Sequence, residues 1–275
     1  MWKKIRILCL LLVLLVVAVN AWRDQNQDWN KPIIVLLHPI NADGRSNTQN
    51  YINTLNINNL NSAQDYLKQA SLQYRGQPIA LYFKQGRELK QLPPKVPEQA
   101  SLLSTVLWSL KFRFYAWQQR QSSDGAATVT LYLNYYDPSQ TQILKHSTAL
   151  QKGKIGSVNL FASAAHSQRN TLVMVHELLH TFGATDKYDL STGQPIYPIG
   201  YADPNQQPLY PQRQAELMAG YVPLSQSKSK MPESLQQTRI NEITAIAFTP
   251  RRPIVPAGQP LPPQPSANEI SPEAL

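Results

Sequence analysis

Two histidines and a glutamate lie close enough in this sequence to act on one metal ion. They belong to the stretch His176-Glu177-Leu178-Leu179-His180. Positions i and i+4 of a helix share a face, so His176 and His180 can both offer an imidazole to a cation such as Zn²⁺. Glu177 stands beside them, off the metal but within reach of a water that the metal would activate. The stretch therefore predicts a hydrolytic zinc site with Glu177 as its general base.

A catalytic zinc takes three protein ligands and keeps one position for water, so a third ligand must come from outside this helical turn. Gly183 follows His180 by three residues, and Asp186 follows Gly183 by three more. Gly183 can adopt the left-handed conformation that ends a helix and turns the chain back. Asp186 is then expected to supply a carboxylate oxygen as the third ligand.

The string from His176 to Asp186 resembles the zinc signature of the metzincin peptidases, with aspartate in place of the usual third histidine, as in the snapalysin type. The resemblance implies a methionine turn beneath the metal. Met218 fits this role, since it is the only methionine between the helix and residue 231. The sequence departs from the metzincin pattern in two places, which leaves the third ligand and the supporting tyrosine open.

The first departure is the aspartate itself, which leaves other candidates for the third ligand. These are Asp189, Glu216 and His166. The second concerns the tyrosine that follows the turn methionine in many metzincins and supports the oxyanion. Tyr221 is placed for this role but stands one residue further along than is common, and Tyr188 is an equal candidate.

The resemblance covers residues 32–249, and it implies an α+β fold. We expect a mixed, mostly parallel twisted sheet packed by helices, with an active-site helix followed by the methionine turn and a C-terminal helix. The strand ending near Ala162 is expected to bind the substrate backbone by strand addition, as its metzincin counterpart does.

These residues predict an exported zinc-dependent endopeptidase. Zn²⁺ would activate a water and polarise the scissile carbonyl, while Glu177 would take the water's proton and pass it to the leaving amine. One alternative is a different zincin in which Glu216 is the third ligand. Another is a non-catalytic, zinc-stabilised binding protein of the cell envelope. Glu177 argues against the second, because a purely structural site needs no general base.

Residues 1–22 are a predicted export segment. Three cations precede an apolar run over residues 7–19, and small residues near Ala21 suit a signal peptidase. A membrane span needs about 17–25 residues, so a cleaved signal peptide is favoured over an anchor through residues 7–22. We expect a protein that is periplasmic, membrane-anchored or secreted.

Composition narrows the class of protein further. Hydrophobic residues make up 42% and charged residues 16% of the chain, which is typical of a folded domain. The net charge of +9 is spread along the chain without a recognition motif, so no nucleic-acid partner is expected. The single cysteine, Cys9, lies in the export segment, so the exported domain has no disulfide. We expect a monomer whose partner is a peptide or protein substrate.

Hydrophobic periodicity predicts one peptidase domain over residues 32–249. A polar spacer at residues 23–31 precedes it, and a Pro-rich disordered tail at residues 250–275 follows it. Strands are expected over residues 33–37, 79–83, 129–135, 143–150 and 155–162. The strand over residues 129–135 is expected to be half-buried because apolar and polar residues alternate in it. Residues 41–61, rich in Asn, Asp, Gly and Ser, are expected to begin as a loop. Helices are expected over residues 62–74, 97–121, 170–183 and 233–248. Asn170 is the expected N-cap of the site helix. The tryptophans and tyrosines at 108–117 and 132–136 are assigned to the core.

Overall fold

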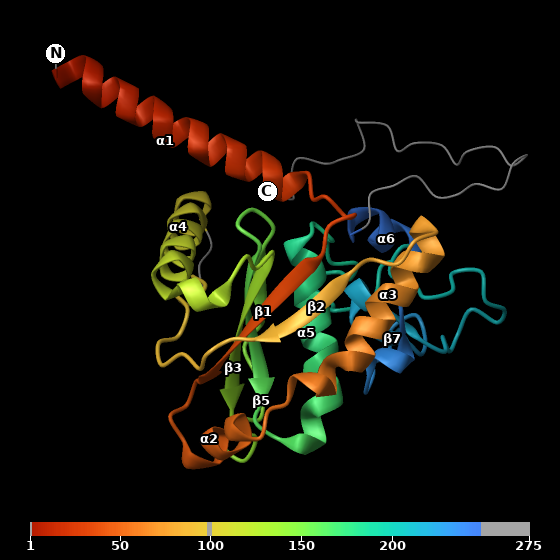
Figure 1. Cartoon of the computed structure of the whole chain (residues 1–275). Helices are drawn as coiled ribbons and strands as arrows, with labels where there is room; N and C mark the ends of the chain where they lie inside the picture. The colour runs from red at the N-terminus through yellow and green to blue at the C-terminus, as the bar shows by residue number, and fades with distance from the viewer. Residues whose placement is uncertain (1, 98–100, 249–275) are drawn as a thin grey trace, which may run out of the picture.

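A five-stranded sheet forms the centre of the domain (Figure 1). The computed structural model describes residues 2–97 and 101–248, so the predicted tail at 250–275 lies outside the described residues. The strand order is β2-β1-β3-β5-β4, and only the edge strand β4 runs antiparallel to its neighbour. The strands are β1 (Ile33–Asn41), β2 (Leu81–Gln85), β3 (Val129–Tyr136), β4 (Thr148–Leu150) and β5 (Ile155–Phe161). The sheet is therefore mixed and mostly parallel, as the sequence predicted.

Helices cover both faces of this sheet (Figure 1). On one face lie α3 (Asn61–Arg75) and α5 (Ser167–Thr181), which share the larger hydrophobic core with the strands. On the other face lies α4 (Leu102–Gln119), which packs on a smaller core. Because a parallel sheet is buried on both faces, β3 is buried along most of its length, and the prediction of a half-buried strand was wrong.

Two other parts of the chain differ from the prediction. A helix, α2 (Ser46–Asn53), lies where a loop was expected. The single helix expected over residues 233–248 was also wrong. The chain there forms a short strand, β9 (Thr238–Arg239), before α6 (Glu242–Phe248), because β9 pairs with β6 (Ala215–Glu216) just before the turn that contains Met218. A second small pair consists of β7 (Val222–Pro223) and β8 (Ser229–Lys230).

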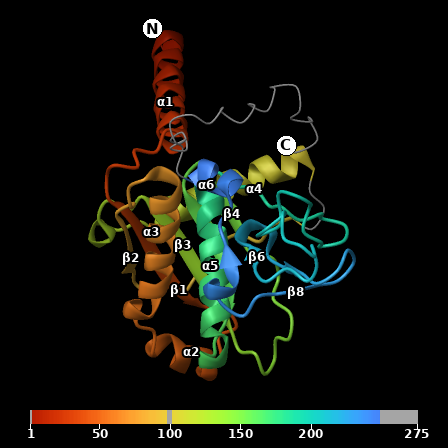
Figure 2. The same cartoon turned by 90° about the vertical axis from the view of Figure 1, so that its right-hand side faces the viewer.

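The N-terminal apolar run forms a helix, α1 (Trp2–Gln25), which extends away from the domain in two views (Figures 1 and 2). Its 24 residues and mean hydropathy of 2.5 are sufficient to cross a membrane, and a signal sequence has the same properties. The Asp24 carboxylate near its end accepts a hydrogen bond from the Gly153 amide at 2.6 Å. The last turn of α1 is thereby joined to the domain.

Candidate metal centre

Helix α5 carries both histidines of the predicted site in its second half and packs on the sheet through its opposite face. The helix begins at Ser167, so Asn170 lies inside it and is not its N-cap. The Asn170 side chain instead donates to the Phe161 carbonyl at 2.8 Å and accepts from the Phe161 amide at 3.1 Å. These two bonds fix the start of α5 to the end of β5.

The structure brings three of the predicted ligands together. The Nε2 atoms of His176 and His180 lie 3.1 Å apart, and each lies 3.1 Å from Asp186 Oδ1. The three atoms form an equilateral triangle of potential metal ligands. Tetrahedral zinc with bonds of about 2.0–2.1 Å holds neighbouring ligand atoms about 3.3–3.4 Å apart, which is close to the observed spacing.

The other ring nitrogen of each histidine is held by a backbone carbonyl. His176 Nδ1 lies 3.0 Å from the Leu217 oxygen, and His180 Nδ1 lies 2.7 Å from the Ala184 oxygen. A carbonyl can only accept, so both Nδ1 atoms carry hydrogen and a neutral ring keeps its lone pair on Nε2. This is the arrangement that orients histidine ligands in metal sites.

These contacts test whether the residues fit a zinc ion. Two neutral imidazoles in this tautomer and an ionised carboxylate would direct three lone pairs at one another across 3.1 Å, and such lone pairs repel. A shared cation or a bound proton removes the repulsion. The nitrogen and oxygen donors match the preference of Zn²⁺, and the site fits the ion.

Titration of the metal-free group follows from the same contacts. Burial alone would lower the pKa of His176, but the hydrogen bond to Asp186 and the neighbouring carboxylates raise it above its usual range. Burial alone would raise the pKa of Asp186, but hydrogen bonds from the two histidines hold it well below its usual range. Both shifts favour an ion pair between His176 and Asp186 when no metal is bound.

Asp186 reaches the histidines because the chain reverses at the end of α5. The Gly183 amide donates to the His180 carbonyl at 3.0 Å, and Gly183 has a φ of +102°. Residues with a side chain rarely adopt this φ, so glycine suits the position, as the sequence predicted. The reversal is what turns the Ala184 carbonyl and the Asp186 carboxylate back toward the helix.

Glu177 is buried next to the triangle. Its Oε2 atom has no hydrogen-bond partner among the described residues. Burial raises the pKa of the Glu177 carboxyl, although the two histidines act in the opposite direction. A buried carboxylate with a free oxygen beside a metal site has the properties required of a proton acceptor.

The turn containing Met218 lies directly behind the site. The carbonyl of Leu217 accepts a hydrogen bond from His176 Nδ1, and the carbonyl of Met218 accepts one from the Lys187 amide at 3.0 Å. Met218 itself is fully buried in the larger core. The turn therefore supports the site on two sides, and the first of these contacts could not be found from sequence spacing, since 41 residues separate its partners.

Glu216 lies at the start of this turn, where its carboxylate is engaged by other groups. Its Oε2 atom accepts from the amides of Met218 and Ala219 at 2.8 and 3.1 Å, and its Oε1 atom accepts from the Thr244 hydroxyl at 2.5 Å. The structure does not bring Glu216 into the triangle, and it gives the carboxylate a role in shaping the turn.

The other candidate residues fall into two groups. Asp189 accepts from Ser191 and Thr192 in an exposed turn, and His166 lies beside the Phe161 ring, so neither joins the triangle. Tyr188 lies nearer to the triangle, where its hydroxyl interacts with the Asp186 carboxylate. Burial and this carboxylate raise the pKa of the Tyr188 hydroxyl to about 12. Tyr221 is partly exposed and contributes to the same shift, so both tyrosines border the site.

The strand expected to bind substrate is partly covered. β5, which ends near Ala162, pairs with β3 along its whole length, and β4 covers its other edge over residues 155–157. The edge strand β4 also contacts α5. Strand addition at this side of the sheet would use β4 or residues 158–161 of β5.

Comparison with known proteins gives little further information. No family model matches the chain, and no curated protein matches it. Among solved structures, the chain is similar to one titled "Structure of a chaperone-substrate complex", with a TM-score of 0.39 and 12% sequence identity. The similarity covers 81% of this chain and 34% of that one, so the chain spans about a third of its length. A likeness this weak shows neither the fold nor the function.

Proposed function

We propose that this chain is a zinc-dependent endopeptidase of the metzincin type, with His176, His180 and Asp186 as the metal ligands. The observation that carries the proposal is the triangle of Nε2, Nε2 and Oδ1 atoms with sides of 3.1 Å. Both imidazoles are oriented by backbone carbonyls, and a buried carboxylate lies beside them. A structural zinc site has four protein ligands, whereas this group has three and leaves a position for water.

Each residue has a separate part in the reaction. Zn²⁺ at this site would supply Lewis acidity, which lowers the pKa of a water and polarises a carbonyl. Glu177 receives a proton on its free carboxylate oxygen and transfers it to the leaving amine nitrogen. Burial raises the pKa of the Glu177 carboxyl, which favours its acceptance of a proton. Tyr188 and Tyr221 border the site and can donate a hydroxyl hydrogen bond to a developing oxyanion.

The metzincin assignment is supported by the residue string, by the position of Met218 and by the order of elements. The antiparallel edge strand β4 beside α5 gives a peptide a place to pair. The alternative in which Glu216 is the third ligand has no support, because the Glu216 carboxylate is engaged within its own turn. We further propose that the protein acts outside the cytoplasm as a monomer on peptide or protein substrates, with α1 as its export signal or anchor.

The substitution Glu177→Gln tests the function. It preserves the size of the side chain and leaves all three ligands in place, but it removes the proton acceptor. We expect peptide hydrolysis to fall by about 10²–10⁴-fold, while zinc content measured by metal analysis stays equal to that of the wild type. A peptide-library digest with and without a chelator is the assay.

Two results would contradict the proposal. Undiminished hydrolysis by Glu177→Gln would show that the residue is not the base. A wild-type digest without chelator-sensitive cuts would instead favour the zinc-stabilised binding protein of the cell envelope.

A further inference from the structure

Helix α4 has two apolar faces, and only one of them is packed. Trp108, Phe112 and Tyr115 are buried against the sheet, where Phe112 and Tyr115 contact the Tyr132 ring. The outward face carries six large apolar side chains that are 49–77% exposed: Leu102, Leu103, Leu107, Leu110, Phe114 and Trp117. We call these six residues the outer face of α4.

The outer face differs from the sequence prediction, which placed the tryptophans and tyrosines of this segment in the core. For Trp117 the prediction was wrong, because Trp108, Phe112 and Tyr115 lie on the opposite side of the helix at spacings of four and three residues. A continuous exposed face of this size is unusual for a soluble monomer and marks a surface that contacts something apolar.

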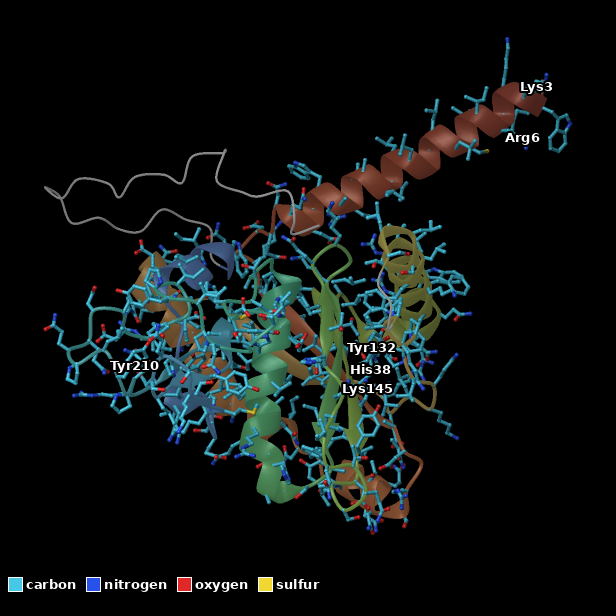
Figure 3. All side chains as sticks on the ribbon, turned by 180° about the vertical axis from the view of Figure 1, so that it is seen from behind. Lys3, Arg6, His38, Tyr132, Lys145 and Tyr210 are labelled. Carbon is cyan, nitrogen blue, oxygen red and sulfur yellow. The ribbon has the colours of Figure 1, made fainter. Side chains whose placement is uncertain are left out.

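The position of α1 indicates which apolar partner the outer face of α4 contacts. Helix α1 leaves the domain on the side where α4 lies (Figures 1 and 3). The last two turns of α1 and the second half of α4 line one cavity of about 440 Å³. Val17 and Asn20 contribute from α1, and Arg113 and Trp117 contribute from α4. A bilayer that holds α1 therefore lies next to the outer face of α4.

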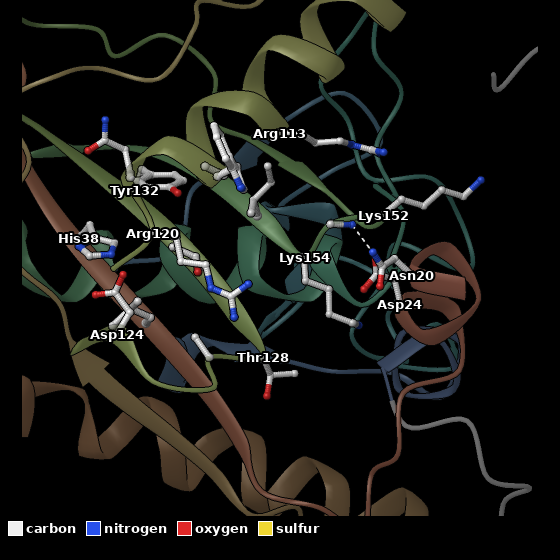
Figure 4. A pocket seen from close by; sticks show the side chains of 18 of the residues that line it. Asn20, Asp24, His38, Arg113, Arg120, Asp124, Thr128, Tyr132, Lys152 and Lys154 are labelled. Atoms are coloured by element: carbon white, nitrogen blue, oxygen red, sulfur yellow. Dashed lines mark hydrogen bonds between the residues drawn. The ribbon is translucent and has the colours of Figure 1, made fainter. Parts of the chain in front are cut away.

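The charges around this cavity suit the headgroups of anionic lipids. Arg113, Arg120 and Lys152 line it (Figure 4). Its two carboxylates are already bonded to backbone amides: Asp24 accepts from Gly153, and Asp124 accepts from Gln121. Helix α4 itself contains two cations and no acidic residue. Cations beside an apolar helix face are the pattern of helices that lie in a membrane interface.

We propose that α1 is a membrane anchor and that the outer face of α4 is a membrane-docking surface, which lies in the interface of the bilayer that α1 spans. In this arrangement Leu103, Leu107 and Leu110 contact acyl chains. Trp117 lies at the depth that tryptophan prefers, between acyl chains and headgroups. The docking surface is separate from the metal centre, and it holds whether or not the protein is a peptidase.

The single cysteine of the chain permits a direct test. In the full-length Cys9→Ser protein, Leu107→Cys places one thiol on the outer face, and Leu190→Cys places one on an exposed loop as a matched control. Each thiol is labelled with an environment-sensitive nitrobenzoxadiazole dye. The proteins are reconstituted into vesicles of phosphatidylethanolamine and phosphatidylglycerol, with or without spin labels on the lipid acyl chains.

We expect the emission maximum of the dye at position 107 to move to the blue and its intensity to fall at least about twofold with acyl-chain spin labels. The dye at position 190 should show neither change. Unshifted emission at position 107 would overturn the proposal, because the outer face would then be in water. A blue shift that spin-labelled lipid does not quench would also overturn it, since a second copy or another part of the chain would then cover the surface.

Discussion

Removing Asp186 is the most direct test of the ligand set. In Asp186→Ala, two neutral imidazoles remain and the only negative charge among the three ligands is lost. Loss of a partner that merely orients a ligand costs about 10–100-fold in metal affinity, so loss of a ligand should cost at least about 100-fold, or about 2.8 kcal/mol.

The loss can be converted into a shift of thermal stability. At free zinc of 100 times the wild-type Kd, binding stabilises the folded protein by about 2.7 kcal/mol, and a 100-fold weaker site gains only about 0.4 kcal/mol. For a domain of this size, 1 kcal/mol changes Tm by about 2–4 °C. Zinc should therefore raise Tm by about 5–11 °C in the wild type and by about 1–2 °C in Asp186→Ala.

The assay is thermal unfolding at buffered free zinc, with Kd from chelator competition. Asp189→Ala is the matched control, because Asp189 accepts hydrogen bonds from an exposed turn outside the triangle. An unchanged zinc response in Asp186→Ala would refute the assignment of Asp186. If Asp186→Ala kept the wild-type response and Glu216→Gln lost it, Glu216 would be the third ligand.

Two predictions concern residues that sequence reasoning misjudged or passed over. Asn170→Ala leaves the amide and carbonyl of Phe161 without their side-chain partner, so the free energy of unfolding should fall by about 1–3 kcal/mol in urea titration. Gln168→Ala, at an exposed position of the same helix, should lower it by less than about 0.5 kcal/mol. Lys154→Met should raise the free energy of unfolding at pH 7 by up to about 3 kcal/mol. Burial lowers the pKa of Lys154 from 10.5 to about 8, so its charge destabilises the folded protein, and the variant removes that charge. Between pH 8 and 10.5 the unfolded wild type binds more protons, so its stability should rise with pH in that window, whereas a flat wild-type profile would show that Lys154 titrates normally.

The local part of the site was predictable because it depends on helix geometry. His176 and His180 share a face of any helix, and Gly183 has the freedom to end that helix, so the sequence suffices to place Asp186 near them. The central sheet followed from apolar runs of strand length. The family to which the chain belongs remains a prediction, as does its activity.

The rest depended on tertiary contacts that leave no local pattern. Asn170 has the chemistry of an N-cap, but the end of β5 lies beside it and takes both of its hydrogen bonds. The apolar residues of α4 fit either face of the helix by spacing alone. Only the position of the sheet decides that Phe112 is buried and Phe114 is exposed.

The role of Glu216 shows how a residue can act on the metal centre without being a ligand. Its carboxylate holds the Met218 and Ala219 amides, and this fixes the turn in which the Leu217 carbonyl faces His176. That carbonyl sets the tautomer of His176 and hence the lone pair on Nε2. A variant of Glu216 would therefore weaken metal binding through the backbone, by about 10–100-fold rather than completely. The size of the loss, and not its occurrence, separates a residue that shapes the turn from a third ligand.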